Sequence, residues 1–414
     1  MHLFLKNISQ LVTVSAHGQP VKKGPAMRDV GVIRNGGILC EQGKIVWVGS
    51  MDDPACPDPV DIPVIDANDK VVLPGFVDSH THAVFAGGRE DEFAMRSRGA
   101  TYQEIAAAGG GILSTMNRVR AAGKKELKRN AAHHMTGMMR HGTTTVEVKS
   151  GYGLSTDAEI RMLEAINELK TEEMINVVPT FIGAHAVPPE YAQRPREYLS
   201  LVTGTMIPYV GRKNLAAFCD VFCDAGYFPV DDAERVLRAG IAAGMKPKIH
   251  ADELSPSGGA VLAGKIGAVS ADHLEHITDE GIRALERGNV VATLLPGVSF
   301  FLNHGYAPAR ALIDADVAVA IATDFNPGSC MSYSMPMMMT IACTQMHMSP
   351  EEALTAATLN GAAALGMSAS IGSIEAGKAA DLIVANTTDF RTLAYHFGTN
   401  HICMTIKNGT ILEF

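Results

Sequence analysis

The middle of the chain alternates short apolar runs with segments that have the apolar spacing of a helix, such as residues 157–172 and 231–244. Apolar runs without strict alternation are typical of parallel strands covered on both faces. Eight strands separated by helices predict a (β/α)8 barrel, an α/β fold. A doubly wound open sheet is the alternative, but it gives the polar strand ends no common meeting point. The runs are GFVDSHTH, GTTTVEVKSG, INVVPTFIGAHA, LAAFCDVFCDAG, MKPKIHADE, GAVSADHLEH, NVVATLLPG and VAVAIATDFNPG.

Both ends of the chain have a different pattern, in which short β-type runs are separated by turns. LVTV, VGVIRNGGILC and KIVWVGS lie near the N-terminus, and ADLIVAN and ICMTIKNGTILEF lie near the C-terminus. Asn35-Gly36 is a turn signal, and Asn408-Gly409 is typical of a hairpin turn. We therefore predict that the two termini combine into one small sheet domain.

Composition and charge restrict the classes of partner. The chain has 414 residues, of which 47% are hydrophobic and 19% charged, and this balance predicts a globular protein with a sizeable core. The net charge is −9 and no basic run is present, so nucleic acids and anionic membranes are poor partners. No apolar run reaches the roughly 18 residues that span a bilayer, and the N-terminus lacks a secretory pattern. We expect a soluble, cytoplasmic protein.

Titratable side chains gather where the eight runs end. In a parallel barrel these ends meet at one rim, and a metal ion is the physical reason to place neutral imidazoles beside a carboxylate there. His80 and His82 are two positions apart, so in a strand they face the same side. With His250 and Asp324 they make a nitrogen and oxygen ligand set that suits zinc or divalent iron. The residues at the run ends are His80, His82, Lys149, His185, Cys223, Asp224, His250, Glu253, His273, Glu275, His276 and Asp324.

Each residue also has a structural interpretation. A single His-x-His pair is weak evidence of a metal site, and His185 or His250 alone is more typical of a hydrogen-bonded core histidine. Asp324 precedes Pro327 and Gly328, where it can cap a turn. The coincidence of these side chains at successive strand ends favours the metal site.

Longer strings resemble a known family. PGFVDSHTH, KIHADE, SADHLEH, ATDFNPGS and IGSIEAGKAADLIV are similar to the amidohydrolase superfamily. HTHAVFAGGREDEF, VEVKSGYGL, FIGAHAVPPEY and TDFNPGS resemble its imidazolonepropionase family, and the resemblance extends over essentially the whole chain. It implies a metal-dependent TIM-like barrel at residues 71–365, a β-sandwich domain from residues 1–70 and 366–414, and a homodimer. It also implies hydrolytic ring opening of 4-imidazolone-5-propanoate to N-formimidoyl-L-glutamate in histidine degradation.

The resemblance also implies roles for individual residues. One divalent ion, zinc or iron, is expected, because the fourth run lacks the lysine that bridges two metals in some relatives. Lys149 lies in the second run and is expected to form hydrogen bonds or balance charge, and Asp78 to form a supporting hydrogen bond. The implied metal ligands are His80, His82, His250 and Asp324, and the implied substrate contacts are Arg89, Tyr152, His185, Glu253, Asn326, Gly328 and Ser329.

The reaction requires an activated water, an oxyanion stabiliser and a proton for the leaving nitrogen. Glu253 is the expected general acid/base, and Asp324 is both a metal ligand and a candidate proton acceptor. His273 is expected to orient the water or polarise the scissile carbonyl, and His185 is the alternative for polarising the carbonyl. Arg89 suits a propionate tail because guanidinium binds carboxylates bidentately, although a surface pairing with Glu90 or Asp91 is the alternative.

Two other functions compete with this one. An aminohydrolase that deaminates a guanine- or cytosine-like ring would share His80, His82, His250, Glu253, His273 and Asp324. Arg89 and the SGYGL segment argue against it, because a neutral base needs no carboxylate clamp. A non-catalytic barrel scaffold is the second alternative, and the presence of all four implied ligands argues against it.

Overall fold

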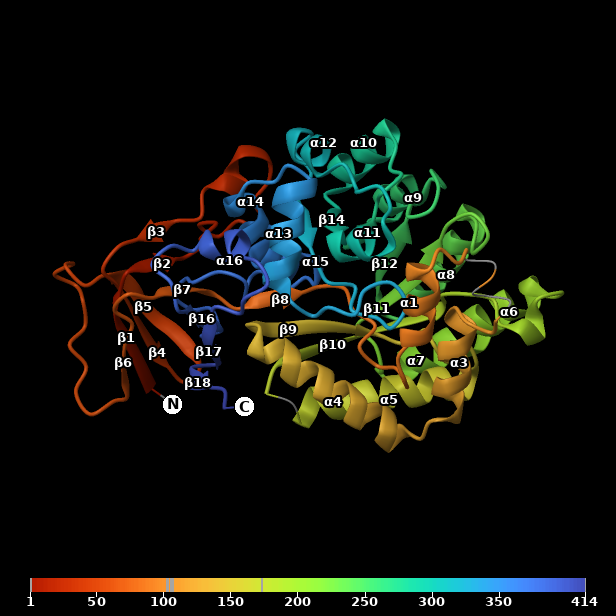
Figure 1. Ribbon diagram of the computed structural model, residues 1–414, viewed down its shortest axis with the longest axis horizontal. Coiled ribbons are helices and arrows are strands. Elements are labelled where there is room, and N and C mark those ends of the chain that lie inside the picture. The colour runs from red at the N-terminus through yellow and green to blue at the C-terminus, as the bar shows by residue number, and fades with distance from the viewer. Residues whose placement is uncertain (1, 102–103, 105–107, 173, 414) are drawn as a thin grey trace.

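The computed structural model describes residues 2–101, 104, 108–172 and 174–413. Eight parallel strands form one sheet in the order β15-β14-β13-β12-β11-β10-β9-β8, so each strand lies beside its neighbour along the chain. All eight predicted strands are present and the predicted barrel is confirmed (Figure 1). The strands are β8 Phe76–Asp78, β9 Thr143–Lys149, β10 Asn176–Ala184, β11 Phe218–Cys223, β12 Lys246–Ala251, β13 Ser270–His273, β14 Val291–Leu294 and β15 Val319–Ile321.

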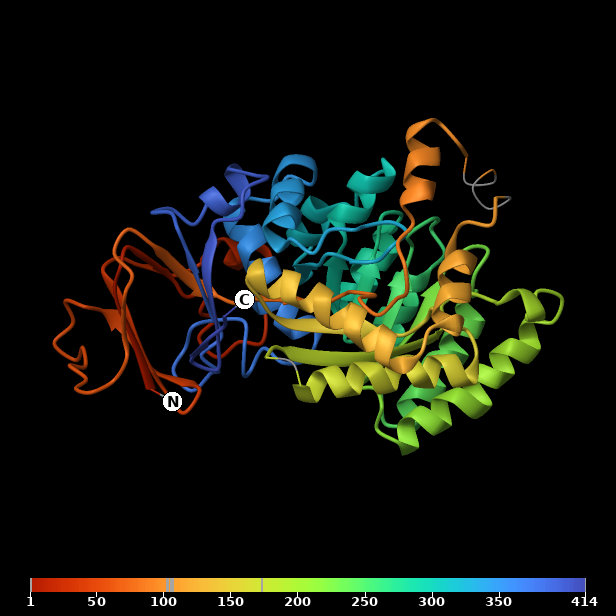
Figure 2. The same ribbon diagram turned by 60° about the horizontal axis from the view of Figure 1, so that its bottom comes forward.

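Helices connect the barrel strands and pack against their outer faces, as α4 and α5 do beside β9 and β10 (Figure 2). The two helices predicted at residues 157–172 and 231–244 correspond to α5 and α8. None of the described helices is long and apolar enough to cross a membrane. The helices are α1 Glu90–Ser97, α3 Ile112–Ala121, α4 Lys124–Arg140, α5 Thr156–Glu172, α6 Pro195–Leu201, α7 Ile207–Arg212, α8 Val230–Ala242, α9 Gly259–Ile266, α10 Asp279–Gly288, α11 Pro296–Leu302, α12 Ala309–Asp314, α13 Met335–Gln345, α14 Pro350–Ala357, α15 Leu359–Ala364 and α16 Thr392–Tyr395.

Both termini build a smaller lobe beside the barrel (Figure 1). One sheet has the strand order β5-β4-β1-β6, and a second has the order β18-β17-β16-β7-β2-β3. Leu5 and Ile38 of the first sheet pack with Leu11, Val72 and Leu382 of the second in one buried cluster, as in a β-sandwich. The strands are β1 His2–Ile8, β2 Gln10–Val12, β3 Val32–Ile33, β4 Gly36–Glu41, β5 Lys44–Ser50, β6 Val64–Asp66, β7 Val71–Pro74, β16 Leu382–Ala385, β17 Ile402–Lys407 and β18 Thr410–Ile411.

The connection between the two lobes is short. β7 pairs with β16 and β2 in the six-stranded sheet, and the chain then enters β8 after Gly75. A Cβ atom at Gly75 would lie 2.3 Å from Thr144 Oγ1, so only glycine fits this close crossing. The domain boundaries at residues 70 and 366 stay a prediction.

The barrel closes where β8 meets β15. Asp78 Oδ1 accepts a hydrogen bond from Thr323 N at 3.0 Å, and its Oδ2 accepts one from Thr323 Oγ1 at 2.6 Å. Just beyond, Asp324 N donates to His80 O at 2.9 Å, and Thr81 pairs with Phe325. Asp78 therefore forms the supporting hydrogen bonds expected of it, and it brings the His80 segment beside the Asp324 segment.

We predict that Asp78→Ala destabilises the fold, because it leaves the Thr323 amide and hydroxyl without partners in the closed barrel. The free energy of unfolding should fall by about 1–3 kcal/mol. Urea unfolding of the metal-free protein measures this change, with Asp58→Ala, an exposed position, as the matched control. Equal stability of the two variants would contradict a closing role for Asp78.

Candidate active site

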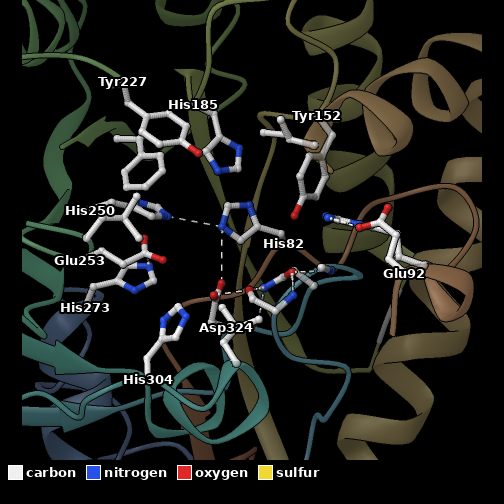
Figure 3. Close-up of a pocket in the computed structure, with 18 of the residues that line it drawn as sticks. His82, Glu92, Tyr152, His185, Tyr227, His250, Glu253, His273, His304 and Asp324 are labelled. Atoms are coloured by element: carbon white, nitrogen blue, oxygen red, sulfur yellow. Dashed lines mark hydrogen bonds and ion pairs between the residues drawn. The ribbon is translucent and has the colours of Figure 1, made fainter. Parts of the chain in front are cut away.

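Four side chains converge at the C-terminal rim of the barrel. His80 Nε2 lies 3.4 Å from Asp324 Oδ1, and His82 Nε2 lies 3.6 Å from the same oxygen. His82 Nε2 also lies 3.4 Å from His250 Nε2 (Figure 3). Within the described part of the chain, His80 Nε2 and Asp324 Oδ1 are buried and have no hydrogen-bond partner. Buried polar atoms are nearly always paired, so unpaired donor atoms gathered within a few ångströms fit a metal ion.

The electrostatics of this cluster fit the same interpretation. Burial lowers the pKa of His80 and His82 well below the ordinary value, and it lowers the pKa of His250 as well. The imidazoles are therefore neutral, which is the form that binds metals. Burial raises the pKa of the Asp324 carboxyl to about 8, and a neighbouring divalent cation would favour its carboxylate form.

Two buried carboxylates hold the outer nitrogens of these imidazoles. His80 Nδ1 donates to Asp272 Oδ2 at 2.7 Å, and Asp220 Oδ2 lies 3.0 Å from His250 Nδ1. A proton on each Nδ1 leaves the Nε2 lone pair directed at the cluster. Such outer partners fix the tautomer and the ring orientation of metal-binding histidines.

Two buried lysines balance the carboxylates. Lys149 Nζ lies 2.8 Å from Asp220 Oδ2 and 2.9 Å from Glu147 Oε2, and Lys248 Nζ lies 3.6 Å from Asp272 Oδ2. Burial opposes the charge on Lys149, but Asp220 and Glu147 outweigh it and raise the pKa of Lys149 above its ordinary value. The expected charge-balancing role of Lys149 is confirmed.

The pattern of polar residues at the ends of the apolar runs does not single out Glu147, Asp220, Lys248 and Asp272. These four side chains lie inside the runs and are fully buried. A signal was present: the strings VEVK, CDVFC, KPKIH and SADH each place charge within an apolar strand. A strand of a closed barrel offers such a charge no route to solvent, so it requires a partner inside.

The cluster forms the floor of a cavity of about 600 Å³ (Figure 3). Every implied site residue except His80 lines this cavity, and His80 lies beneath it, fully buried. The lining residues that the sequence implied are His82, Arg89, Tyr152, His185, His250, Glu253, His273, Asp324, Asn326, Gly328 and Ser329. Other residues that line the cavity, which the sequence did not single out, include Glu92, Arg96, Phe222, Tyr227 and His304.

Glu253 and His273 face each other on one side of the cavity. Glu253 Oε2 lies 3.4 Å from His273 Nε2, and burial raises the pKa of the Glu253 carboxyl to about 7. Burial opposes charge on His273, but Glu253 and Glu275 outweigh it and raise its pKa to about 10. The backbone of His273 has a φ of 82°, a strained conformation that favours glycine and is typical of functional sites.

Tyr152 and His185 belong to a second wall, which Glu159 stabilises. The buried Glu159 carboxylate accepts hydrogen bonds from Gly151 N at 2.9 Å and Gly153 N at 2.7 Å, so it holds the Tyr152 loop. His185 Nδ1 donates to Gly151 O at 3.0 Å, and its ring stacks on His82 at 5.0 Å. Burial lowers the pKa of His185 to about 3, so its Nε2 is an acceptor that faces the cavity.

The TDFNPGS segment forms a compact turn around Asn326. Asn326 Oδ1 accepts from Gly328 N at 2.7 Å and from Ser329 N at 2.8 Å, while Asn326 Nδ2 donates to Ser329 Oγ at 2.7 Å. The Gly328 amide is therefore engaged within the turn. Arg89 pairs with Glu92 at 2.6 Å, and not with Glu90 or Asp91 as in the surface interpretation.

A (β/α)8 barrel with a histidine and aspartate cluster at its C-terminal rim defines a metal-dependent hydrolase, and comparisons with known proteins agree. The model of the Amidohydrolase family matches residues 230–412. Imidazolonepropionase from Geobacillus kaustophilus (strain HTA426) is 47% identical over 413 residues, which cover 99% of this chain and 97% of the relative. Imidazolonepropionase from Alkaliphilus oremlandii (strain OhILAs) is 45% identical over 412 residues, with 99% and 97% coverage. The chain belongs to the imidazolonepropionase family.

Solved structures with lower identity share the fold. An adenosine deaminase from Xanthomonas campestris with bound zinc has a TM-score of 0.73 at 20% identity, covering 99% of this chain and 92% of that chain. A guanine deaminase from C. acetobutylicum with bound guanine has a TM-score of 0.69 at 18% identity, covering 100% of both chains. At these identities the likeness concerns the barrel and its accompanying sheets.

We predict that Asp272→Asn weakens metal binding, because the carboxylate that orients His80 is lost. The dissociation constant for zinc should rise by about 10- to 100-fold. Competition with a chromophoric chelator measures it, with Asp279→Asn, an exposed aspartate, as the control. Urea unfolding of the metal-free forms separates weaker binding from a loss of fold. An unchanged zinc affinity would show that Asp272 does not orient a metal ligand.

Proposed function

We propose that this chain hydrolyses 4-imidazolone-5-propanoate to N-formimidoyl-L-glutamate, a step of histidine degradation. The observation that carries the proposal is the convergence of His80, His82, His250 and Asp324 on the floor of a cavity that also contains Arg89. Membership of the imidazolonepropionase family supports the choice of substrate.

We propose that the site binds one divalent metal ion, zinc or iron, with the ligands His80, His82, His250 and Asp324. When bound, this ion would act as a Lewis acid and would lower the pKa of a water toward about 7. A single ion is favoured because β11, the fourth barrel strand, supplies no lysine to bridge two ions.

The proposed roles of the other residues follow from their positions. Water adds to the ring carbonyl carbon, the bond from that carbon to the ring nitrogen breaks, and the nitrogen receives a proton. Glu253 takes the proton from the water and returns it to the leaving nitrogen, because it lines the cavity and its pKa is close to neutral pH. His273 lies against Glu253 and orients it. His185 Nε2 accepts a hydrogen bond from a ring N–H.

The other end of the cavity suits the propionate side chain. Glu92 and Tyr152 lie across the cavity from Glu253 (Figure 3). Arg89 pairs with Glu92 and lines the same cavity, and its guanidinium is the proposed donor to the carboxylate. The hydroxyls of Tyr152 and Ser329 line the same cavity and are proposed as further donors, and Asn326 and Gly328 form the turn that presents Ser329.

The products distinguish the proposed ring opening from the alternative deamination. We expect purified, metal-loaded protein to consume 4-imidazolone-5-propanoate and form N-formimidoyl-L-glutamate without releasing ammonia, as followed by mass spectrometry. His250→Ala should lose both the activity and the metal measured by elemental analysis, because one of the four ligands is absent. Full activity in a metal-free His250→Ala variant would disprove the metal-dependent mechanism, and ammonia release would favour the deaminase alternative.

The family resemblance also leads us to propose a homodimer. Tyr395 at the end of α16 and Phe397 just after it have 85% and 65% of their surfaces accessible, and such aromatic side chains are enriched in protein interfaces. Light scattering coupled to size-exclusion chromatography should give a mass of about twice the 44.0 kDa chain. A mass of one chain at micromolar concentration would contradict the homodimer.

A further inference from the structure

A second arginine lies near Arg89 at the same end of the cavity. Arg89 precedes α1 and Arg96 lies in its last turn, and both side chains line the cavity. Arg89 Nε and Arg96 Nη1 are buried, and neither has a hydrogen-bond partner among the residues that the structure describes. Buried guanidinium N–H groups are rarely left unpaired, so two of them at one end of a cavity indicate a missing acceptor.

Both guanidinium groups approach the same peptide. A Cβ atom at Gly328 would lie 2.2 Å from Arg89 Nη1, so only glycine leaves room for Arg89 there. Arg96 Nη2 donates to Gly328 O at 3.3 Å, and Phe301 lies under Arg96 with its ring centroid 5.4 Å from Cζ. The turn after Asp324 therefore positions both groups, and Phe301 supports the Arg96 plane.

The charge at this end of the cavity is unbalanced. Glu92 is the carboxylate here, and its two oxygens accept from Arg89 Nη2 at 2.6 Å and from Gly111 N at 3.0 Å. Of the other carboxylates among the described residues that line the cavity, Glu253 lies on the opposite side from Glu92, and Asp324 lies between them in the cluster with His82 (Figure 3). Two guanidinium groups and one carboxylate leave one net positive charge, which matches one carboxylate of a ligand. Burial and the charge of Arg89 lower the pKa of Arg96, and the charge of a bound anion would act in the opposite direction by favouring the charged guanidinium.

We propose that Arg96 donates to the side-chain carboxylate of the substrate together with Arg89, and thereby selects an anionic tail over a neutral one. The inference rests on the proposed function for the identity of that tail. The placement of Arg96 does not depend on the ring chemistry. Arg96 belongs to α1, as does Glu92, and Glu92 lies across the cavity from Glu253 (Figure 3). The alternative is that Arg96 only holds the turn at Gly328.

Two probes separate these roles. Imidazole-4-propanoate carries the carboxylate, and imidazole-4-propanamide is its neutral counterpart with the same ring. Calorimetry on the metal-loaded protein should show that Arg96→Ala weakens binding of the propanoate by about 10- to 100-fold, the loss expected for one charge-assisted hydrogen bond. Binding of the propanamide should change by less than about threefold, since a neutral tail does not use the charge.

Three further variants make the test specific. Arg89→Ala should show the same selective loss, and Arg96→Lys should recover part of it because it keeps the charge without the planar donor. Arg98→Ala removes an exposed arginine just past the end of α1 and should bind both probes as the unaltered protein does. With the substrate, Arg96→Ala should raise KM while kcat stays within about threefold, because the lost contact is far from the reacting bond.

Three results would overturn the proposal: an equal loss for both probes in Arg96→Ala, no loss for either, or an unaltered protein that does not prefer the propanoate. An equal loss would assign Arg96 to support of the turn. A different result would disprove the proposed function alone. In that case the unaltered protein would not open the imidazolone ring, but it would still prefer the propanoate, and Arg96→Ala would still lose that preference.

Discussion

The active site depends on charges buried inside the barrel. Lys149 and Lys248 are fully buried, and they pair with Asp220 and Asp272, which in turn contact the outer nitrogens of His250 and His80. Removing charges from water is unfavourable unless each has a partner, so this network exists only when the strands that carry it are in register. The positions of His80 and His250 are thus a consequence of barrel assembly.

Barrel closure has an equally direct effect on the site. The hydrogen bonds between Asp78 and Thr323 join the end of β8 to the segment that follows β15. The chain continues from there to His80 on one side and to Asp324 on the other, and the Asp324 amide donates to His80 O. His273 and Asp324 have positive φ values of 82° and 48° at the ends of their strands. A backbone conformation of this kind is unfavourable and persists only when the surrounding structure holds it in place. Here the closed barrel holds both residues in these conformations.

The sequence predicted the eight strands because burial on both faces requires continuous apolar runs, and each observed strand lies within its predicted run. It also predicted that His80, His82, His250 and Asp324 lie together, because polar residues at the ends of parallel strands must meet at one rim. It did not single out Asp220, Asp272 or Lys248, since the partner of a charge within an apolar run is not visible in the run itself. Arg96 was missed for a related reason, because an arginine in an amphipathic helix is usually on the surface.

The sequence by itself determined the order of elements, the composite lobe formed by both termini and the chemical character of the site. These features depend on local periodicity and on which residue types follow each strand. Only the tertiary structure decided which charges pair inside the barrel, that the Gly328 amide is engaged by Asn326, and that Arg89 and Arg96 approach one peptide. Those contacts join segments far apart in the chain, or depend on the conformation of a single turn, and neither leaves a periodic signal in the sequence.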